Sequence, residues 1–344
     1  MTGEKSAVTK AEEYEREAAR LWDSGELAHL QEAANLYNSA ASEYAKTRDG
    51  EKHSLKCRGY YSLLSGISML EMNNVKEATQ AFEIAGDLFL RVGGDSLHRT
   101  SEIYRHCTLV MQQILDLNYE GARMHYGEAI KQLKTLEDKG FEIRKGTRAL
   151  ILELAGENSF TQAFLLYMRG TLEAAAPSIS EASSSYEKAG ETVGETSLGH
   201  SYLEYSKAIR SVHKIWKAKK LQEEWDLETA QKSLIEAEGD FSNSIGNLSK
   251  SPFSTPRQES LLSRVKGEKS VASGLLKLCT AFISLMAGNP GKAKKEFYEA
   301  RESYREAIEY FSKAGYFGHF ESVFARERYE DSYRVIRAME QYHK

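Results

Sequence analysis

The sequence predicts an all-α protein: a right-handed α-solenoid, or superhelix, of about six antiparallel helical hairpins plus a C-terminal capping helix. Three observations support this prediction. Only four prolines interrupt 344 residues that are otherwise rich in helix-forming types. One packing pattern recurs along the chain, and a helix-capping residue precedes nearly every copy of it at a constant distance.

The recurring pattern is Ala-x-x-x-Φ-x-x-Ala-x-x-x-Φ, where Φ is a bulky apolar or aromatic residue. Spacings of four, three and four put all four residues on one helix face, so small and large side chains alternate along it. Small residues let neighbouring helices approach closely and large ones fill the space between them, so such a helix needs neighbours on both sides. The six copies are Ala33, Tyr37, Ala40, Tyr44; Ala78, Phe82, Ala85, Phe89; Ala122, Tyr126, Ala129, Leu133; Ala175, Ile179, Ala182, Tyr186; Ala230, Leu234, Ala237, Phe241; and Ala293, Phe297, Ala300, Tyr304.

Helix starts are marked by a residue four positions before the leading alanine of each copy. A side-chain oxygen at an N-cap accepts a hydrogen bond from a backbone N–H that lacks an intrahelical partner. His29 is the one exception in this position, and Pro290 fits the first helical position of the last copy. The five capping residues are Asn74, Asn118, Thr171, Asp226 and Asn289.

Between the copies lie segments with helical periodicity of their own, such as Leu55, Gly59, Leu63, Ile67 and Leu70, which predict the first helix of each hairpin. Leading alanines are 45, 44, 53, 55 and 63 residues apart, so we expect the hairpins to lengthen toward the C-terminus by growth of their helices. The predicted pairs are 6–22 with 30–47, 52–72 with 75–92, 96–116 with 119–138, 143–169 with 172–190, 197–224 with 227–247 and 257–287 with 290–314, followed by a capping helix at 317–342.

Residues 249–256, Ser-Lys-Ser-Pro-Phe-Ser-Thr-Pro, hold two of the four prolines and predict a loop before the sixth hairpin. We therefore expect five hairpins in 1–248, a linker at 249–256, and the long sixth hairpin with the capping helix in 257–344. This linker is the expected hinge. Its Ser251-Pro252 and Thr255-Pro256 pairs are typical of an ordinary exposed loop, and phosphorylation there is the alternative.

The composition of the chain limits which binding partners and which cellular compartment we expect for it. The formal net charge is −4, from 46 basic and 50 acidic side chains, which gives no reason to expect nucleic acid or anionic lipid. Cys57, Cys107 and Cys279 form no Cys-x-x-Cys pair, which argues against a zinc knuckle or a disulfide framework and suits a reducing cytoplasm. Met1–Glu17 is polar, and the best apolar stretch, Leu275–Ala287, has about 13 residues where a membrane span needs about 20. We expect a cytoplasmic protein without an integral membrane segment.

The pattern Ala-x-x-x-aromatic-x-x-Ala resembles the second-helix signature of tetratricopeptide (TPR) repeats, and Gly66 matches the glycine of that family's first helix. The segment Glu32–Tyr44, with paired alanines and aromatics, is similar to soluble NSF attachment proteins. These resemblances imply a divergent TPR-like superhelix that binds other proteins, or a vesicle-fusion adaptor. Asp23–Glu26 is polar where attachment proteins carry a hydrophobic loop, and Tyr342–Lys344 stands where they end in an apolar residue.

Candidate chemistry is sparse, so we expect no enzyme and no cofactor. His98, Glu102 and His106 share a helix face at i, i+4 and i+8. The two histidines would lie about 12 Å apart along the axis, too far to bind one metal ion together. A polar or partly buried stripe is therefore predicted, with metal binding by an adjacent pair as the alternative. Gly288–Ala293 lacks the spacing of a phosphate loop and predicts a tight turn between helices.

Tyrosines outside the repeated stripe are the best candidates for partner contacts, because tyrosine offers a large contact area at little entropy cost. The basic segment Lys214–Lys220 suits an acidic peptide or nucleic acid, whereas the acidic residues that begin at Glu223 favour a solvated helix face. The predicted function is a non-catalytic scaffold or adaptor that binds a protein or peptide on the concave face of the first helices. A peptide- or small-ligand-sensing switch is the alternative. The candidate binding residues are Tyr60, Tyr61, Tyr104, Tyr167, Tyr202, Tyr205, Lys214, Trp216 and Lys217.

Overall fold

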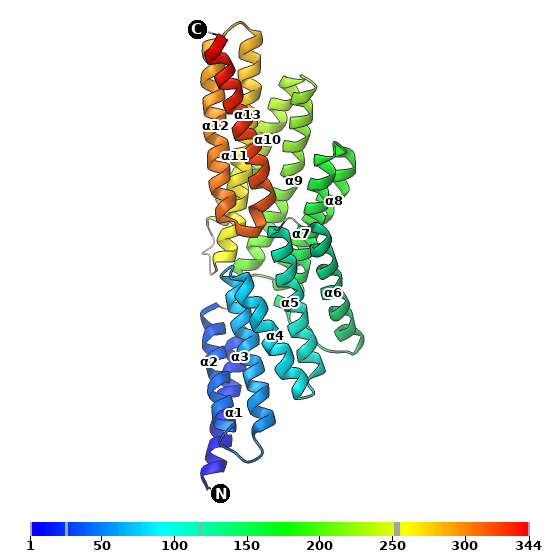
Figure 1. Cartoon of the computed structure of the whole chain (residues 1–344), viewed down its shortest axis with the longest axis vertical. Helices are drawn as coiled ribbons and strands as arrows, with labels where there is room; N and C mark the ends of the chain where they lie inside the picture. The colour runs from blue at the N-terminus through cyan, green and yellow to red at the C-terminus, as the bar shows by residue number, and fades with distance from the viewer. Residues whose placement is uncertain (1, 25–26, 117, 251–254, 343–344) are drawn as a thin grey trace. The chain divides into compact units, whose positions relative to one another are not determined.

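The structure is a computed structural model that describes residues 2–24, 27–116, 118–250 and 255–342. In these residues it contains thirteen α-helices, one short 3-10 helix and no strand (Figure 1). The helices are α1 Thr2–Ser24, α2 Leu27–Tyr44, α3 Glu51–Glu71, α4 Val75–Arg91, α5 Asp95–Leu115, α6 Tyr119–Asp138, α7 Lys145–Met168, α8 Leu172–Val193, α9 Ser197–Glu223, α10 Leu227–Leu248, α11 Pro256–Met286, α12 Pro290–Lys313, the 3-10 helix η1 Gly315–Gly318 and α13 His319–Tyr342.

The predicted hairpins are confirmed. Each predicted pair of ranges corresponds to a pair of consecutive helices, and neighbours such as α3 and α4 pack directly on each other (Figure 1). The lengthening is carried by the helices, as expected: α3 has 21 residues and α11 has 31, while α2 has 18 and α12 has 24. The chain is thus an all-α solenoid of helical hairpins that ends in an additional helix.

The repeated stripe forms the core of the hairpins. All of its alanines are buried, and so are its bulky residues except Tyr126 and Leu133, which are half-buried. The stripe packs against glycines on the preceding helix. A Cβ atom at Gly59 of α3 would lie 2.6 Å from Phe89 of α4, and one at Gly274 of α11 would lie 2.8 Å from Tyr304 of α12. Side chains of any size at these positions would prevent the two helices of a hairpin from approaching this closely.

The five predicted capping residues all stand at the N-cap of a helix. Three of them make the expected side-chain bond, because Asn118, Asp226 and Asn289 accept from the backbone N–H three residues ahead at 3.1, 3.3 and 3.2 Å. Asn74 and Thr171 make no such bond. The helix starts therefore follow the sequence signal even where the capping bond itself is missing.

The described residues divide into two compact units. One contains α1 to α6, α7 up to Leu154, and the start of α11 through Arg257, and the other contains the remainder. This division falls inside α7. The hinge predicted at 249–256 stays a prediction, because residues 251–254, which include the Ser251-Pro252 pair, lie outside the described residues. Residues 25–26 and 343–344, which belong to the two segments compared with attachment proteins, also lie outside them.

The three cysteines are fully buried. The Cys57 thiol donates a hydrogen bond to Glu15 Oε1 at 3.1 Å. Burial raises the pKa of all three thiols, that of Cys279 to about 11. They pack as small apolar side chains.

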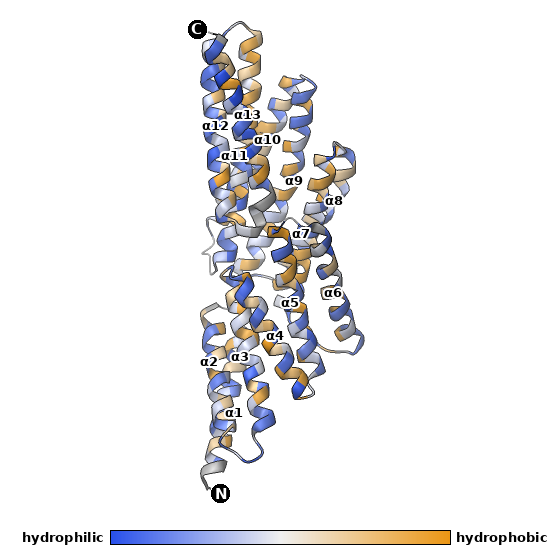
Figure 2. Ribbon diagram, viewed as in Figure 1, coloured by the Kyte–Doolittle hydropathy of each residue, from blue (hydrophilic) through white to orange (hydrophobic). Residues whose placement is uncertain are grey.

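One described helix, α11, is long and apolar enough to span a membrane by length and composition, with a mean hydropathy of 1.3 over its best window. Because 44% of that window is buried inside the protein, α11 also fits the core helix of a repeat array. Figure 2 shows polar and apolar residues mixed along the other helices. The sequence had placed the apolar stretch at Leu275–Ala287, within and just beyond this helix.

Candidate binding pocket beside Trp225

Five of the turns between described helices place the residue directly before the N-cap in the left-handed backbone conformation. These residues are Asn73, Gly93, Gly170, Trp225 and Gly288, with φ angles of 62°, 75°, 77°, 64° and 70°. Glycine adopts this conformation freely and asparagine tolerates it, but a bulky L-residue there costs about 1–2 kcal/mol. Trp225 is therefore the exception in a position that the other turns fill with small or polar residues.

The side chain of Trp225 is 63% exposed, so burial does not account for its presence. The turn around it is well formed: its backbone N–H donates to the Gln222 carbonyl at 3.2 Å, and that of Asp226 donates to the Leu221 carbonyl at 2.9 Å. An exposed large aromatic held on a strained backbone marks a candidate functional position.

Trp225 borders a pocket with a volume of about 310 Å³ between α9, α11, α12 and α13. Its indole meets the ring of Phe282 edge-on at 5.6 Å between centroids, and Phe282 meets Phe297 in the same way at 5.4 Å. These three rings form a continuous apolar wall. The remaining lining residues are Lys219, Gln222, Glu223, Leu278, Arg328, Asp331, Ser332 and Val335.

The pocket lining includes two ion pairs, and in each pair the cation is less exposed than the acid. Lys219 donates to Glu223 Oε1 at 2.6 Å, and its side chain is 10% exposed while that of Glu223 is 62% exposed. Arg328 pairs with Asp331 at 3.5 Å, with exposures of 24% and 51%. The Nε of Arg328 has no hydrogen-bond partner among the described residues. The pocket therefore combines an apolar wall of three rings with two ion pairs whose cations are largely covered.

Two of the residues predicted for binding lie next to the pocket. Trp216 precedes Lys219 and Glu223 on α9 by three and seven residues, so the three share one helix face. Tyr167 of α7 stacks on Trp216 with 4.8 Å between centroids and 8° between planes. Burial raises the pKa of Tyr167 to about 12, although the Arg328 cation opposes this shift. Tyr167 and Trp216 thus stack on each other near the α9 residues that line the pocket, but do not line it themselves.

The other predicted binding residues are spread over the two units. Tyr104, Tyr202 and Tyr205 are buried, like Trp216, and pack against aromatic rings of neighbouring helices. Tyr60 stacks on Tyr37 at 4.7 Å and is half-buried. Lys214 donates to Asp240 at 2.8 Å. Tyr61 and Lys217 are exposed.

The binding role of the first-helix surface stays a prediction. Of the predicted binding residues, Tyr61 and Lys217 are exposed to solvent, and Tyr60, Tyr167 and Lys214 are partly exposed. The buried tyrosines hold the first helices to the second ones. Trp225 lay outside the predicted set, although its place before the cap Asp226 was visible in the sequence.

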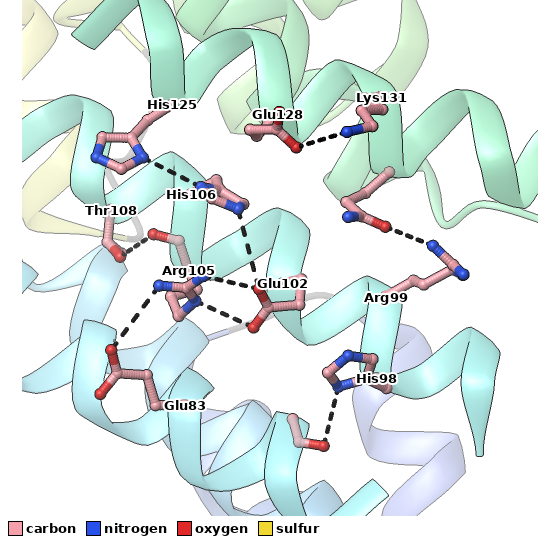
Figure 3. Close-up of polar contacts among 12 residues, drawn as sticks. Glu83, His98, Arg99, Glu102, Arg105, His106, Thr108, His125, Glu128 and Lys131 are labelled. Carbon is pink, nitrogen blue, oxygen red and sulfur yellow. Dashed lines mark hydrogen bonds and ion pairs between the residues drawn. The ribbon is translucent and has the colours of Figure 1, made fainter. Parts of the chain in front are cut away.

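The His98, Glu102 and His106 stripe lies on α5 and is engaged by neighbouring groups (Figure 3). His98 Nδ1 is 3.1 Å from the Gly86 carbonyl, and Arg105 donates to Glu102 at 3.0 and 2.8 Å. His106 Nδ1 lies 3.2 Å from Nδ1 of His125 on α6. The stripe is partly buried and polar, as predicted.

Burial, with the nearby Arg105 cation, lowers the pKa of both His106 and His125, so both rings are neutral at neutral pH. One ring then donates and the other accepts. Among the described residues no group of three or more histidine, cysteine, aspartate or glutamate side chains is placed to hold a metal ion.

Hairpins, a buried alanine stripe and glycine contacts define the class of this protein: it is an all-α helical-repeat protein built from antiparallel hairpins. No protein-family model matches the chain, and no curated protein matches it. Among solved structures, it is similar to a circular tandem repeat protein with novel repeat topology and enhanced subunit contact surfaces, at 12% identity over 99% of this chain and 98% of that one, with a TM-score of 0.19. It is also similar to the TPR domain of P58(IPK), at 14% identity over 95% and 98%, with a TM-score of 0.18. At these TM-scores the class of the protein rests on its own helices and their contacts.

Proposed function

We propose that this chain is a non-catalytic, cytoplasmic scaffold or adaptor that binds a protein or peptide partner through the pocket beside Trp225. One observation carries the proposal: a tryptophan occupies, and exposes its ring at, a left-handed turn position that the other turns give to asparagine or glycine. Tryptophan is the residue type most enriched in the energetic centres of protein interfaces.

The pocket suits a peptide side chain better than a whole small-molecule substrate. Its volume of about 310 Å³ is at the lower end of ligand sites and accepts one large apolar side chain. The edge-on ring contacts of Trp225, Phe282 and Phe297 leave an apolar surface for that side chain.

A library of displayed peptides, selected against the full chain, tests this proposal. Selected peptides are measured against the wild-type protein and against Trp225→Asn, which keeps a residue type that tolerates the backbone conformation. The exposed Ile235 of α10, 58% accessible and outside the pocket lining, gives the matched control Ile235→Asn.

We expect Trp225→Asn to weaken peptide affinity about tenfold or more, ~1.4 kcal/mol, while its circular dichroism and unfolding midpoint stay close to wild type. Ile235→Asn should bind like the wild type. Selection of no peptide, or equal affinity for Trp225→Asn and wild type, contradicts the pocket as the binding site.

A further inference from the structure

A cluster of four charged residues lies in the core of the second compact unit, away from any surface. Arg264 and Glu268 come from α11, Glu157 from α7 and Glu321 from α13. All four are buried, and Arg264 is among the most completely enclosed large side chains of the protein. Buried charges on this scale are costly unless they are paired and hydrogen-bonded.

Arg264 uses its guanidinium for two of the three carboxyl groups. Its Nε and Nη2 donate to Glu321 Oε1 at 2.8 and 2.5 Å, and its Nη1 donates to Glu157 Oε1 at 2.6 Å. The ring of Phe160 lies 4.5 Å from the guanidinium carbon. The Tyr186 hydroxyl donates to the same oxygen of Glu157.

Two of the remaining carboxyl oxygens, Glu268 Oε1 and Glu321 Oε2, are buried and have no hydrogen-bond partner among the described residues. Besides the four charged residues, the titratable groups that face the cluster are the phenols of Tyr186 on α8 and Tyr205 on α9. One positive charge therefore faces three carboxyl groups, and full ionisation would leave two uncompensated negative charges in the core.

The cluster avoids that state by binding protons. Burial, together with the neighbouring Glu321, raises the pKa of Glu268 well above its usual range. Burial also raises the pKa of Glu157 to about 7, although Arg264 and the Tyr186 hydroxyl act in the opposite direction. The folded protein thus favours the protonated form of Glu268, and Glu157, with a pKa of about 7, changes its protonation in the neutral range.

We infer that Glu157, Arg264, Glu268 and Glu321 form a proton-binding site that holds the first turns of α13 in place and loosens them when the protons leave. The direction in which stability changes with pH follows from thermodynamic linkage between proton binding and folding. The folded protein binds these protons more tightly than the unfolded chain, so the stabilisation is greatest at low pH and is lost as pH rises through the folded-state pKa values.

The same turns of α13 lead to the pocket. Glu321, Phe324 and Arg328 are spaced by three and four residues and so share one helix face. Phe324 packs edge-on against Tyr167 at 6.3 Å, and the Arg328 guanidinium lies 5.0 Å from the Phe324 ring. Arg328 lines the pocket. Loosening at Glu321 therefore reaches the pocket wall, and this last step rests on the proposed function of the pocket.

The second half of α13 is anchored separately. Ile336 packs with Ala281, Ala293 and Phe297 in a buried apolar cluster, and the Tyr298 hydroxyl donates to Glu340 at 2.9 Å. Proton loss should therefore act on the part of α13 around Glu321 to Arg328 and spare the part beyond Val335.

Hydrogen exchange on the full chain tests the inference without any partner. We expect the protection of backbone amides over residues 321–332 to fall about tenfold between about pH 6 and about pH 8.5, after correction for intrinsic exchange, while α13 beyond residue 335 changes little. Glu157→Gln together with Glu268→Gln, which mimic the two protonated acids, should abolish this difference. The exposed Glu327→Gln, on the same helix, should leave it unchanged.

A second measurement protects against a variant that folds poorly. Carbon-13 labelling of glutamate side chains reports protonation directly in the wild-type protein, and a Glu268 carboxyl that is ionised at about pH 6 overturns the inference. Equal protection of residues 321–332 at both pH values overturns it too. If no peptide binds in the pocket but the exchange difference is observed, the proposed function is rejected and the proton-binding site is retained.

Discussion

Gly66 of α3 lies directly against the ring of Phe82 of α4: a Cβ atom at position 66 would be 2.6 Å from Phe82 Cε1. Gly59 receives Phe89 in the same way one heptad earlier, and Gly274 and Gly267 of α11 receive Tyr304 and Phe311. An aromatic ring of the second helix thus enters a gap that a missing side chain leaves on the first. This contact sets how closely the helices of a hairpin approach.

Gly66→Ala should lower the free energy of unfolding by about 1–3 kcal/mol, because the added methyl group overpacks the contact with Phe82. Alanine is the better helix former, so a helical glycine with open space around it gives the matched control. Gly127→Ala in α6, where a Cβ meets nothing within 4 Å, should raise the free energy of unfolding by up to about 1 kcal/mol. Chemical denaturation of both variants measures the two effects, and equal behaviour would contradict the packing described for α3 and α4.

Arg257→Ala should lower the free energy of unfolding by about 3–5 kcal/mol. The guanidinium of Arg257 is buried and donates to Glu153 Oε1 at 2.6 Å and to Glu71 Oε1 at 3.1 Å, so its removal leaves the buried Glu153 without that cation. The exposed pair of Arg20 with Glu17 supplies the comparison, and Arg20→Ala should leave the free energy of unfolding close to that of the wild type. Urea titrations of the two variants decide between these magnitudes.

Acidification should weaken the contact between α5 and α6. The pKa values of His106 and His125 are lowered in the folded protein, chiefly by burial, so the unfolded chain binds protons that the folded pair does not. Stability from this pair is complete above the unfolded-state pKa and is lost as pH falls below it. His125→Gln should show a smaller loss of stability than wild type between about pH 7.5 and about pH 5.5. A difference of zero between the two proteins would rule out the pair as a titrating contact.

Trp225 should dominate the quenching of tryptophan fluorescence by acrylamide. Its ring is 63% exposed, whereas Trp216 is buried and Trp22 is half-covered, with the Arg144 guanidinium 3.6 Å from its ring. Trp225→Asn should therefore remove most of the quenching, and Trp216→Phe should leave it nearly unchanged. Strong quenching that survives Trp225→Asn would show that the turn does not present this ring to solvent.

The fold could be predicted from the sequence because its signals are local and repeated. The alanine stripe and the cap four residues before it lie within or at the start of a single helix. Asn118 and Ala122 therefore predict α6 from local sequence alone, whatever packs against it. The glycine contacts could be predicted only in part. Gly66 matches a glycine of the TPR pattern, whereas the role of Gly59, seven residues earlier, is seen only in the structure, where the ring of Phe89 packs against it.

The candidate site was harder to predict. A usable signal existed for Trp225, because it precedes the cap Asp226 just as Gly170 and Gly288 precede theirs. No comparable signal exists for the buried charges, since Arg264 stands 107 residues from Glu157 and 57 from Glu321. Pairings at such separations follow no helical period, and they become visible only when the helices are packed.

The burial of all three native thiols makes the chain convenient for site-specific labelling. Their raised pKa values keep them mostly as thiols at neutral pH, and the thiolate is the reactive form. A cysteine introduced at an exposed position, as in Tyr61→Cys or Lys217→Cys, would react with a maleimide well before the native ones. Spin labels placed on α3 and α9 in this way, with Cys57, Cys107 and Cys279 left intact, measure the separation of the two compact units in solution.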